Sequence, residues 1–349
     1  MSDHTNQIGG KFLVQPVGSE PIYCREKFTE EHRDIEQMVK EFGRERIYPN
    51  KEQIESFDKD LSLSLIRETG ELGLLGVGVS EEYGGMDLDK ITTAIVIESI
   101  ATGYSSSFLT TFSVQTAIGM LPIAWFGTKE QKEKYLPKLV TGEWIGAYGL
   151  TEPSAGSDAL SGKTKAVLSD DGKHYILDGE KIFITNGSWA DVYTVFAQVD
   201  GNKFSAFIVD RDTPGFKVGP EEKKMGIKGS STVTINFDDC QVPVENVLGK
   251  IGKGHRIAFN VLNIGRWKLG AAAVGGCKRV LKEMVPYVIE RKQFGKSLSE
   301  FGLIRKKVAD CSISTYATES IMYRVAGLYD HAIAALDKSD PEYDYKCIK

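Results

Sequence analysis

The segment 148–158, which reads Tyr-Gly-Leu-Thr-Glu-Pro-Ser-Ala-Gly-Ser-Asp, gathers small, hydroxylic and turn-forming residues. Small residues let the backbone N–H groups of a loop approach a ligand closely, and the hydroxyls of Thr151 and Ser157 can add directed hydrogen bonds. Such a loop could hold the edge of a planar polar ring. Taken alone, the same residues suit an ordinary surface turn equally well.

A second segment, 179–187, reads Gly-Glu-Lys-Ile-Phe-Ile-Thr-Asn-Gly. Its β-branched and aromatic residues predict a strand, and the closing Asn-Gly pair predicts a tight turn. By itself this pattern is typical of a plain hairpin. A specific chemistry follows only if the two segments meet.

Together, and in this order, the two segments resemble the acyl-CoA dehydrogenase family. In that family Glu-Pro-x-x-Gly-Ser-Asp is followed by Gly-x-Lys-x-aromatic-Ile-Thr-Asn-Gly. The resemblance covers nearly the whole chain after residue 28. It continues through Arg211, 214–215, 225–230, 263–266 and 290–295.

This resemblance implies an FAD enzyme that desaturates a fatty acyl-CoA between its alpha and beta carbons. Hydrogen bonds from a threonine hydroxyl and from main-chain N–H groups would make the flavin a better hydride acceptor, and an aromatic side chain could cover the ring. By the resemblance, Ser157 lies near both the flavin and the acyl-CoA. The residues assigned to the flavin are Tyr148, Leu150, Thr151, Ser157, Phe183 and Thr185.

Arg291 falls where a helix is expected to end, a position at which a solvated cation already favours the helix dipole. The resemblance assigns it another role. It implies that Arg291, Gln293 and Phe294 reach the diphosphate and adenine end of the FAD in a neighbouring subunit. The planar guanidinium suits a diphosphate because it forms paired, charge-assisted hydrogen bonds. We therefore expect a homo-oligomer, either a dimer or a tetramer.

An isolated arginine in a helix, such as Arg266, usually lies at the surface. The resemblance instead implies that the stretch around it lines the acyl-CoA site. Arg266 would order the catalytic end of this site, and Asn263 would lie near the thioester and pantetheine.

Abstraction of the alpha proton requires a general base on the face of the substrate opposite the flavin. In a minority of the family a glutamate directly precedes the pocket arginine, but that position is Gly265 here. Most members carry the glutamate further along, at a place expected beyond Lys349. We therefore expect a C-terminally truncated chain without its base, most like the very-long-chain branch. Glu290, Glu300 and Glu319 are expected on helix faces and are not assigned this role.

The elements around these segments predict an α+β fold of acyl-CoA dehydrogenase type. Thr29 precedes helically spaced apolar residues, so it is expected to cap a helix, and a long apolar stretch over 91–123 predicts a buried helical layer. Beyond Gly142, short β-branched runs alternate with turn signals and predict an antiparallel sheet or barrel. Two long helices are expected over 257–287 and 304–335, as an incomplete helical bundle.

The corresponding domains are expected to fall into four consecutive parts. The first, residues 1–28, is an N-terminal extension. An N-terminal helical domain (29–145), a middle β domain (146–248) and a partial C-terminal helical domain (249–349) follow.

Composition excludes several other classes of partner. The net charge of −5, without a basic cluster, predicts no nucleic-acid binding. No uncharged apolar run of bilayer-spanning length is evident, so no transmembrane segment is expected. Metal binding is not expected either. Five scattered cysteines without a Cys-x-x-Cys pair favour a reducing compartment, and the absence of a presequence pattern favours bacterial cytoplasm over a mitochondrial matrix.

An electron-transfer flavoprotein is the electron acceptor that the resemblance implies. An acyl-CoA oxidase or flavin monooxygenase on the same scaffold would instead let reduced flavin meet oxygen. A chain lacking the base could also serve as a binding or assembly partner. The last alternative is a mixed helix and sheet protein that binds no flavin. It would require the matches to the family at Thr151, Phe183 and Arg291 to be coincidences.

Overall fold

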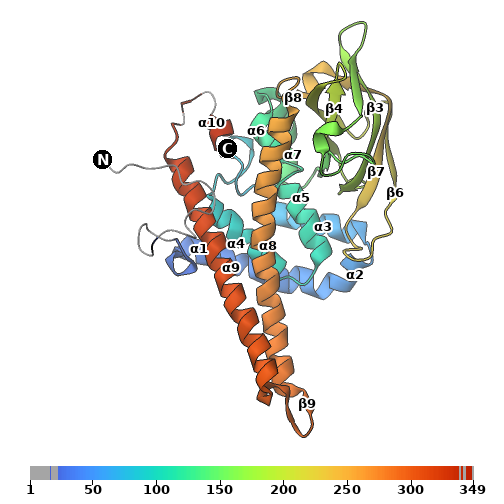
Figure 1. Ribbon diagram of the computed structural model, residues 1–349. Coiled ribbons are helices and arrows are strands. Elements are labelled where there is room, and N and C mark those ends of the chain that lie inside the picture. Colours follow the sequence, from blue (N-terminus) through green and yellow to red (C-terminus); the bar gives the residue numbers. More distant parts are fainter. Residues whose placement is uncertain (1–15, 17–22, 338, 341–342, 348–349) are drawn as a thin grey trace.

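The computed structural model describes residues 16, 23–337, 339–340 and 343–347 (Figure 1). Most of the predicted extension over 1–28 lies outside the described residues. From Tyr23 onward the chain forms short helices, then a sheet, then two long helices. The predicted α+β order is confirmed.

The first region is a layer of short helices around a buried centre. Thr29 caps the first of them, because its hydroxyl accepts a hydrogen bond of 3.1 Å from the amide of His32. In the fourth helix every residue from Ile91 to Ala101 is buried. The predicted buried layer is thus confirmed, although it is divided among several helices. The helices are α1 (Glu30–Phe42), α2 (Lys51–Glu55), α3 (Lys59–Glu71), α4 (Lys90–Ala101), α5 (Ser106–Thr116), α6 (Leu121–Phe126) and α7 (Lys129–Val140).

One stretch in the described part of the chain, Ser106–Phe126, is by length and composition apolar enough to cross a membrane, although no run of that length was expected from the sequence. However, 72% of its most apolar window is buried inside the protein. Its apolar side chains therefore have partners in the core, as those of a core helix do.

The middle region is a sheet with the strand order β6-β7-β3-β2-β4-β5-β8, and β1 also pairs with β4. Most pairs are antiparallel, as predicted, but β1 and β2 both run parallel to β4, so the sheet is mixed. The strands are β1 (Gly146–Gly149), β2 (Lys165–Leu168), β3 (His174–Thr185), β4 (Val192–Val199), β5 (Lys203–Asp210), β6 (Phe216–Glu221), β7 (Thr232–Pro243) and β8 (Val247–Leu248).

Strand β3 is irregular near its end. Its register with β7 shifts between Lys181 and Ile184, and Phe183 within this bulge has a φ of 59°. A bulge bends a strand and re-aims the side chains that it carries. Beyond β3, Asn186 has a φ of 64°, in agreement with the predicted Asn-Gly turn.

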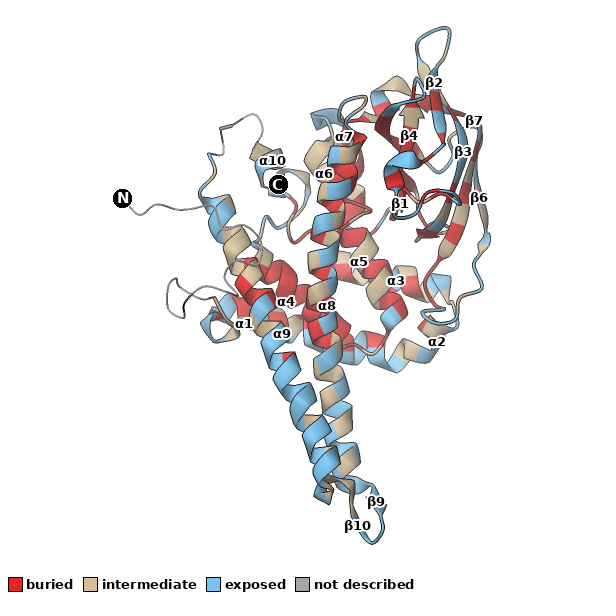
Figure 2. Cartoon of the chain, viewed as in Figure 1, coloured by how far each residue is buried: buried red, intermediate tan, exposed pale blue. Residues whose placement is uncertain are grey.

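The two long helices α8 (Gly254–Glu290) and α9 (Gly302–Ala334) form a hairpin, which confirms their prediction. Figure 1 shows the hairpin extending away from the sheet, with β9 at its tip. The buried residues of α8 all lie between Gly254 and Gly275, and Figure 2 shows the distal part of the hairpin mostly exposed. The remaining elements are β9 (Lys292–Gln293), β10 (Lys296–Ser297) and α10 (Tyr343–Lys346).

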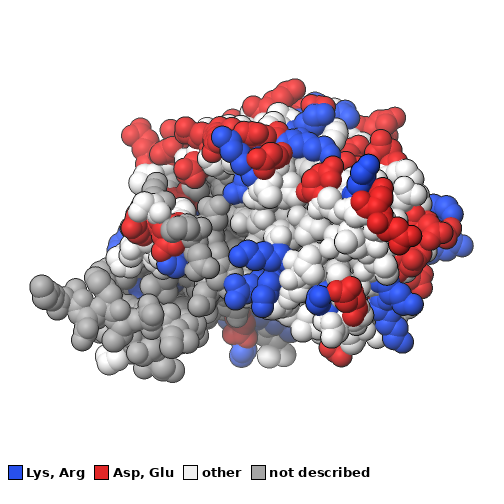
Figure 3. Space-filling model, turned by 90° about the horizontal axis from the view of Figure 1, so that it is seen from above, with Lys and Arg blue, Asp and Glu red and all other residues white. Residues whose placement is uncertain are grey.

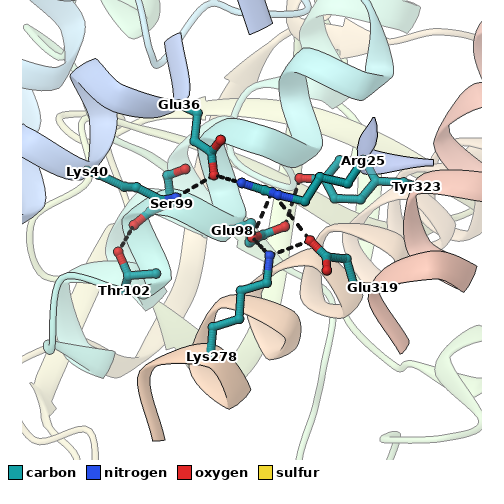
Figure 4. Close-up of polar contacts among 9 residues, drawn as sticks. All are labelled: Arg25, Glu36, Lys40, Glu98, Ser99, Thr102, Lys278, Glu319 and Tyr323. Atoms are coloured by element: carbon teal, nitrogen blue, oxygen red, sulfur yellow. Dashed lines mark hydrogen bonds and ion pairs between the residues drawn. The ribbon is translucent and has the colours of Figure 1, made fainter. Parts of the chain in front are cut away.

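A charge cluster joins the base of this hairpin to the first region (Figure 4). At its centre Glu98 of α4 is 1% exposed. It accepts hydrogen bonds from Lys278 of α8 at 2.5 Å and from the hydroxyl of Tyr323 of α9 at 2.7 Å. Three cations balance three carboxylates, so no charge in the cluster is left without an opposite neighbour. Its charged members are Arg25, Glu36, Lys40, Glu98, Lys278 and Glu319.

Candidate functional site

A pocket of about 310 Å³ lies where the sheet meets the residues after α5 and the first half of α8. It brings together three stretches that are far apart in sequence: the loop after β1, the end of β3 and one face of α8. Of the predicted site residues, Tyr148, Leu150, Thr151, Ser157, Phe183, Thr185 and Arg266 line it.

The loop after β1 is held by its own backbone and by β3. Glu152 and Ala155 exchange backbone hydrogen bonds of 3.1 and 3.0 Å, which closes a tight turn. The carbonyl of Thr151 accepts a hydrogen bond of 2.9 Å from the amide of Ile182. Thr151 and the bulge of β3 therefore lie side by side, as an arrangement of two linked segments rather than the plain turn and plain hairpin that each pattern alone would allow.

Phe183 presents an apolar ring to this pocket. The residue is 62% exposed although it belongs to a strand, and its positive φ places it in the left-handed region. That conformation is uncommon for a bulky residue and is concentrated at ligand sites. The bulge thus turns an aromatic face outward, where a planar ligand could cover it.

Tyr148 lies at the inner wall of the pocket. Its hydroxyl donates to the carbonyl of Ala258 on α8 at 3.4 Å, and its ring contacts Phe196 edge to face. Burial raises the pKa of Tyr148 above the ordinary value, so the phenol stays neutral at physiological pH. It can therefore contribute apolar surface and a hydrogen bond, but not an anion.

Arg266 brings a cation to the pocket from α8. Its Nη1 donates to Oδ1 of Asn263 one turn earlier, at 2.8 Å. Asn263 does not line the pocket itself, so its direct contact is with the arginine that does. At the adjacent Gly265, an added Cβ would meet only Ile118, at 3.7 Å. Among the described residues that line the pocket there is neither Asp nor Glu.

Arg291, Gln293 and Phe294 lie elsewhere, at the exposed tip of the α8–α9 hairpin. Arg291 is the C-cap of α8, and Phe294 is 92% exposed. Within one chain the structure does not bring these residues to the pocket. Their role toward a neighbouring subunit stays a prediction.

Five apolar residues of the pocket were not predicted: Ile118, Ala159, Ile184, Phe259 and Leu262. Ile118, Phe259 and Leu262 fall in apolar stretches that were expected to be helical, where a residue is more often core than ligand contact. Two of them could have been predicted. Phe259, Leu262 and Arg266 recur at intervals of three and four and so share one face of α8, so the assignment of Arg266 to the site implies that Phe259 and Leu262 lie there too.

A second, smaller cavity of about 30 Å³ shares no lining residue with the pocket. It contains the buried ammonium of Lys268, which donates to the carbonyl of Thr116 at the end of α5, at 2.6 Å. Burial, and secondarily the charge of Lys90, lower the pKa of Lys268 to about 7. Sequence reasoning did not single out this lysine.

Other kinds of site find little support in the described part of the chain. No group of His, Cys, Asp and Glu there could hold a metal ion. Figure 3 shows positive and negative side chains interspersed on the face that it presents, without a broad patch of one sign.

Three family models match successive parts of the sequence. They are the acyl-CoA dehydrogenase N-terminal domain over residues 29–143, the middle domain over 147–240 and the C-terminal domain over 252–340.

Individual relatives agree with these matches. A probable acyl-CoA dehydrogenase of Bacillus subtilis is 47% identical, over 96% of this chain and 56% of the relative. An acyl-CoA dehydrogenase of the same organism is 40% identical, over 87% of this chain and 80% of the relative. The human very long-chain specific acyl-CoA dehydrogenase is 38% identical, over 92% of this chain and 50% of the relative. The chain thus spans little more than half the length of some of its relatives.

A solved structure is also similar. The acyl-CoA dehydrogenase of Bacillus anthracis, described as complexed with FAD, superimposes with a TM-score of 0.93 at 46% identity. The match covers 97% of this chain and 60% of that one.

Proposed function

Because the chain belongs to the acyl-CoA dehydrogenase family, we propose that its pocket binds FAD beside a fatty acyl-CoA, for oxidation of the acyl chain to the trans-2-enoyl thioester. The observation that carries this proposal is the meeting of the loop after β1 with the bulge of β3. This meeting brings Thr151, Phe183 and Thr185 onto one pocket.

The residues present fit a flavin. Thr151 and Thr185 offer hydroxyls, Phe183 offers an exposed aromatic face, and Tyr148 adds a neutral wall. A planar ring with a polar edge needs this combination of donors and apolar surface. When bound, FAD would supply the hydride acceptor that no protein side chain can provide.

On the substrate side, the protein's contribution is binding and orientation. Ser157 and the cation of Arg266 lie on the same pocket as the flavin-facing residues, so they can hold the polar thioester end of the substrate. The hydrogen bond from Arg266 to Asn263 fixes the guanidinium in one orientation. The apolar side chains of Ile118, Phe259 and Leu262 would exclude water from the reacting carbons.

Removal of the alpha proton needs a base that this pocket does not contain. Its lining within the described residues has no carboxylate, and Gly265 has no side chain to offer one. We therefore assign the base, a glutamate by family resemblance, to none of the described residues that line this pocket.

Assembly and partners are part of the same proposal. The exposed tip of the α8–α9 hairpin leaves Arg291, Gln293 and Phe294 free of the chain's own pocket, which suits their donation to the FAD of a second copy. The proposal further includes a homo-oligomer and an electron-transfer flavoprotein as electron acceptor. It also includes a role in fatty acid beta-oxidation in a bacterial cytoplasm.

An anaerobic titration tests the proposal. The purified chain is reconstituted with FAD and titrated with a long-chain saturated acyl-CoA, while the visible flavin absorbance is followed. FAD retained with its spectrum perturbed by the acyl-CoA, but not bleached, is the expected result. Failure to bind FAD would contradict the assignment of the pocket, and bleaching would show that the chain contains a competent base.

A matched pair of variants localises the binding. Thr185→Val should weaken FAD binding about tenfold, because it removes a hydroxyl from the pocket. Thr110→Val serves as the control, since the hydroxyl of Thr110 donates to Ser106 within α5 and does not line the pocket. Equal affinities for the two variants would count against this position of the flavin.

A further inference from the structure

Behind the pocket lies a buried ion pair between Glu152 and Lys181. Nζ of Lys181 donates to Oε1 of Glu152 at 2.6 Å, and their side chains are 1% and 5% exposed. Neither residue lines the pocket. Any effect of this pair on a ligand must therefore act through its neighbours in the chain.

Those neighbours are the residues proposed to face the flavin. Glu152 directly follows Thr151, and Lys181 is separated from Phe183 by a single residue. The backbone hydrogen bond from Ile182 to Thr151 joins the same two segments at 2.9 Å. The ion pair and this bond are thus two adjacent links between the loop after β1 and the bulge of β3.

The carboxylate of Glu152 is also anchored on its other side. Oε1 accepts from the hydroxyl and the amide of Thr164 at 2.7 and 3.1 Å, and Oε2 accepts from the amide of Lys163 at 2.5 Å. These donors precede β2, so one carboxylate ties three segments together. Burial raises the pKa of Glu152, but the hydrogen bond and charge of Lys181, together with the hydrogen bonds from Thr164 and Lys163, outweigh it and hold the pKa below its ordinary value. The carboxylate is ionised at neutral pH.

The bulge of β3 depends on such an anchor to keep its conformation. Phe183 holds a left-handed conformation with its ring exposed, so little packing of its own side chain keeps it there. A strained conformation persists only where the surrounding structure enforces it. Lys181 is the last residue in register with β7 before the shift, at the point where an anchor would fix the start of the bulge.

We propose that Glu152 and Lys181 are a positioning pair, which fixes Thr151 relative to Phe183 and Thr185 so that the pocket is prearranged for an isoalloxazine ring. The inference rests on the proposed function for the identity of the ligand. The arrangement itself is a property of the chain and can be measured without flavin.

The test variant is Glu152→Gln with Lys181→Met. The glutamine oxygen can still accept from Thr164, its amide nitrogen takes the place of the oxygen that accepts from Lys163, and the link to residue 181 is lost. Because the double change leaves no unpaired buried charge, it avoids the main cause of instability in single variants. Lys306→Met is the control, since it removes a lysine from an exposed ion pair with Asp310 on α9, which shares no member with the pocket.

The first readout is amide hydrogen exchange in the flavin-free chain. The double variant should speed exchange of the 179–187 segment at least tenfold, while Lys306→Met leaves this segment unchanged. Unaltered exchange in the double variant would overturn the positioning role, whether or not the chain binds FAD.

The second readout uses FAD itself. The double variant should bind it at least tenfold more weakly and with a shifted visible circular dichroism spectrum, and the control should match the wild type in both. A spectrum and affinity equal to those of the wild type would overturn the proposal. If the wild type binds no FAD, the proposed function fails, and the exchange experiment still decides the role of the pair.

Discussion

At the scale of single residues, Lys268 shows how burial changes the chemistry of a side chain. Its ammonium donates to a carbonyl rather than to a carboxylate, so nothing in the hydrogen bond restores the charge–charge stabilisation that a buried cation needs. The neutral amine becomes accessible near physiological pH, where an ordinary lysine is fully charged.

This predicts a pH dependence of stability with a definite sign. Between the lowered pKa of about 7 and the ordinary value of 10.5, the unfolded chain binds a proton at Lys268 that the folded chain does not. The free energy of unfolding should therefore rise with pH across this window, by up to about 1.4 kcal/mol per pH unit. Urea titrations of the wild type and of Lys268→Met from pH 7 to 10 measure the difference. Parallel curves would show that the lysine does not titrate there.

At the scale of elements, the charge cluster decides how the two long helices attach to the rest. Lys278 bridges Glu98 and Glu319, so α8, α4 and α9 meet at one ammonium group. Removal of one partner from a buried pair leaves a carboxylate uncompensated, and this is more damaging than the pair was stabilising.

We expect Lys278→Met to lower the free energy of unfolding by about 3 kcal/mol. Lys306→Met is its control, because Lys306 pairs with Asp310 on the exposed side of α9 and its loss should change stability by less than about 0.5 kcal/mol. Chemical denaturation of both variants measures the contrast. Similar losses of stability in both variants would mean that burial of the charge cluster does not determine how much it contributes to the free energy of unfolding.

Local patterns predicted the elements that depend on local chemistry. Thr29 and its helix, the two long helices and the longer strands all follow from capping and periodicity. Strands β1 and β6 carry a weaker local signal because each contains glycine, and β6 also proline, which are unfavourable in a strand. The partnership of Glu98 and Lys278, 180 residues apart, has no local signal at all.

The residues of the candidate site also fall into those that local patterns predict and those that they do not. Residues on its loop and strand carried a recognisable pattern, so Thr151, Phe183 and Thr185 could be named in advance. The left-handed conformation of Phe183 could not, because it depends on the register between β3 and β7. Ile118 also entered the pocket without a signal, since only the packing of α5 against the sheet brings it there.

At the scale of the whole molecule, the hairpin tip is the part that a second copy would use. Arg291→Ala should weaken FAD retention at least tenfold while leaving the helical circular dichroism intact, because the exposed guanidinium contributes little to folding. Lys292→Ala, a neighbouring exposed cation, is the control and should retain FAD. Flavin content after gel filtration measures both. Equal retention by the two variants would argue against donation of Arg291 to a second copy.

The distribution of buried residues along α8 also sets where the protein opens first. Beyond Gly275 no described residue of α8 is buried, and in α9 the first buried residue is Thr315. Tyr104 still donates to Glu283 of α8 at 2.6 Å, but beyond that contact the two helices can fray without disturbing the core, so opening should begin at the tip and proceed toward the charge cluster. Amide protection factors should therefore climb along α8 from residue 290 back toward 254. Limited proteolysis should cut first near the tip. In the isolated chain this hairpin would then be the first part to be degraded, and a neighbouring copy in an oligomer would protect it.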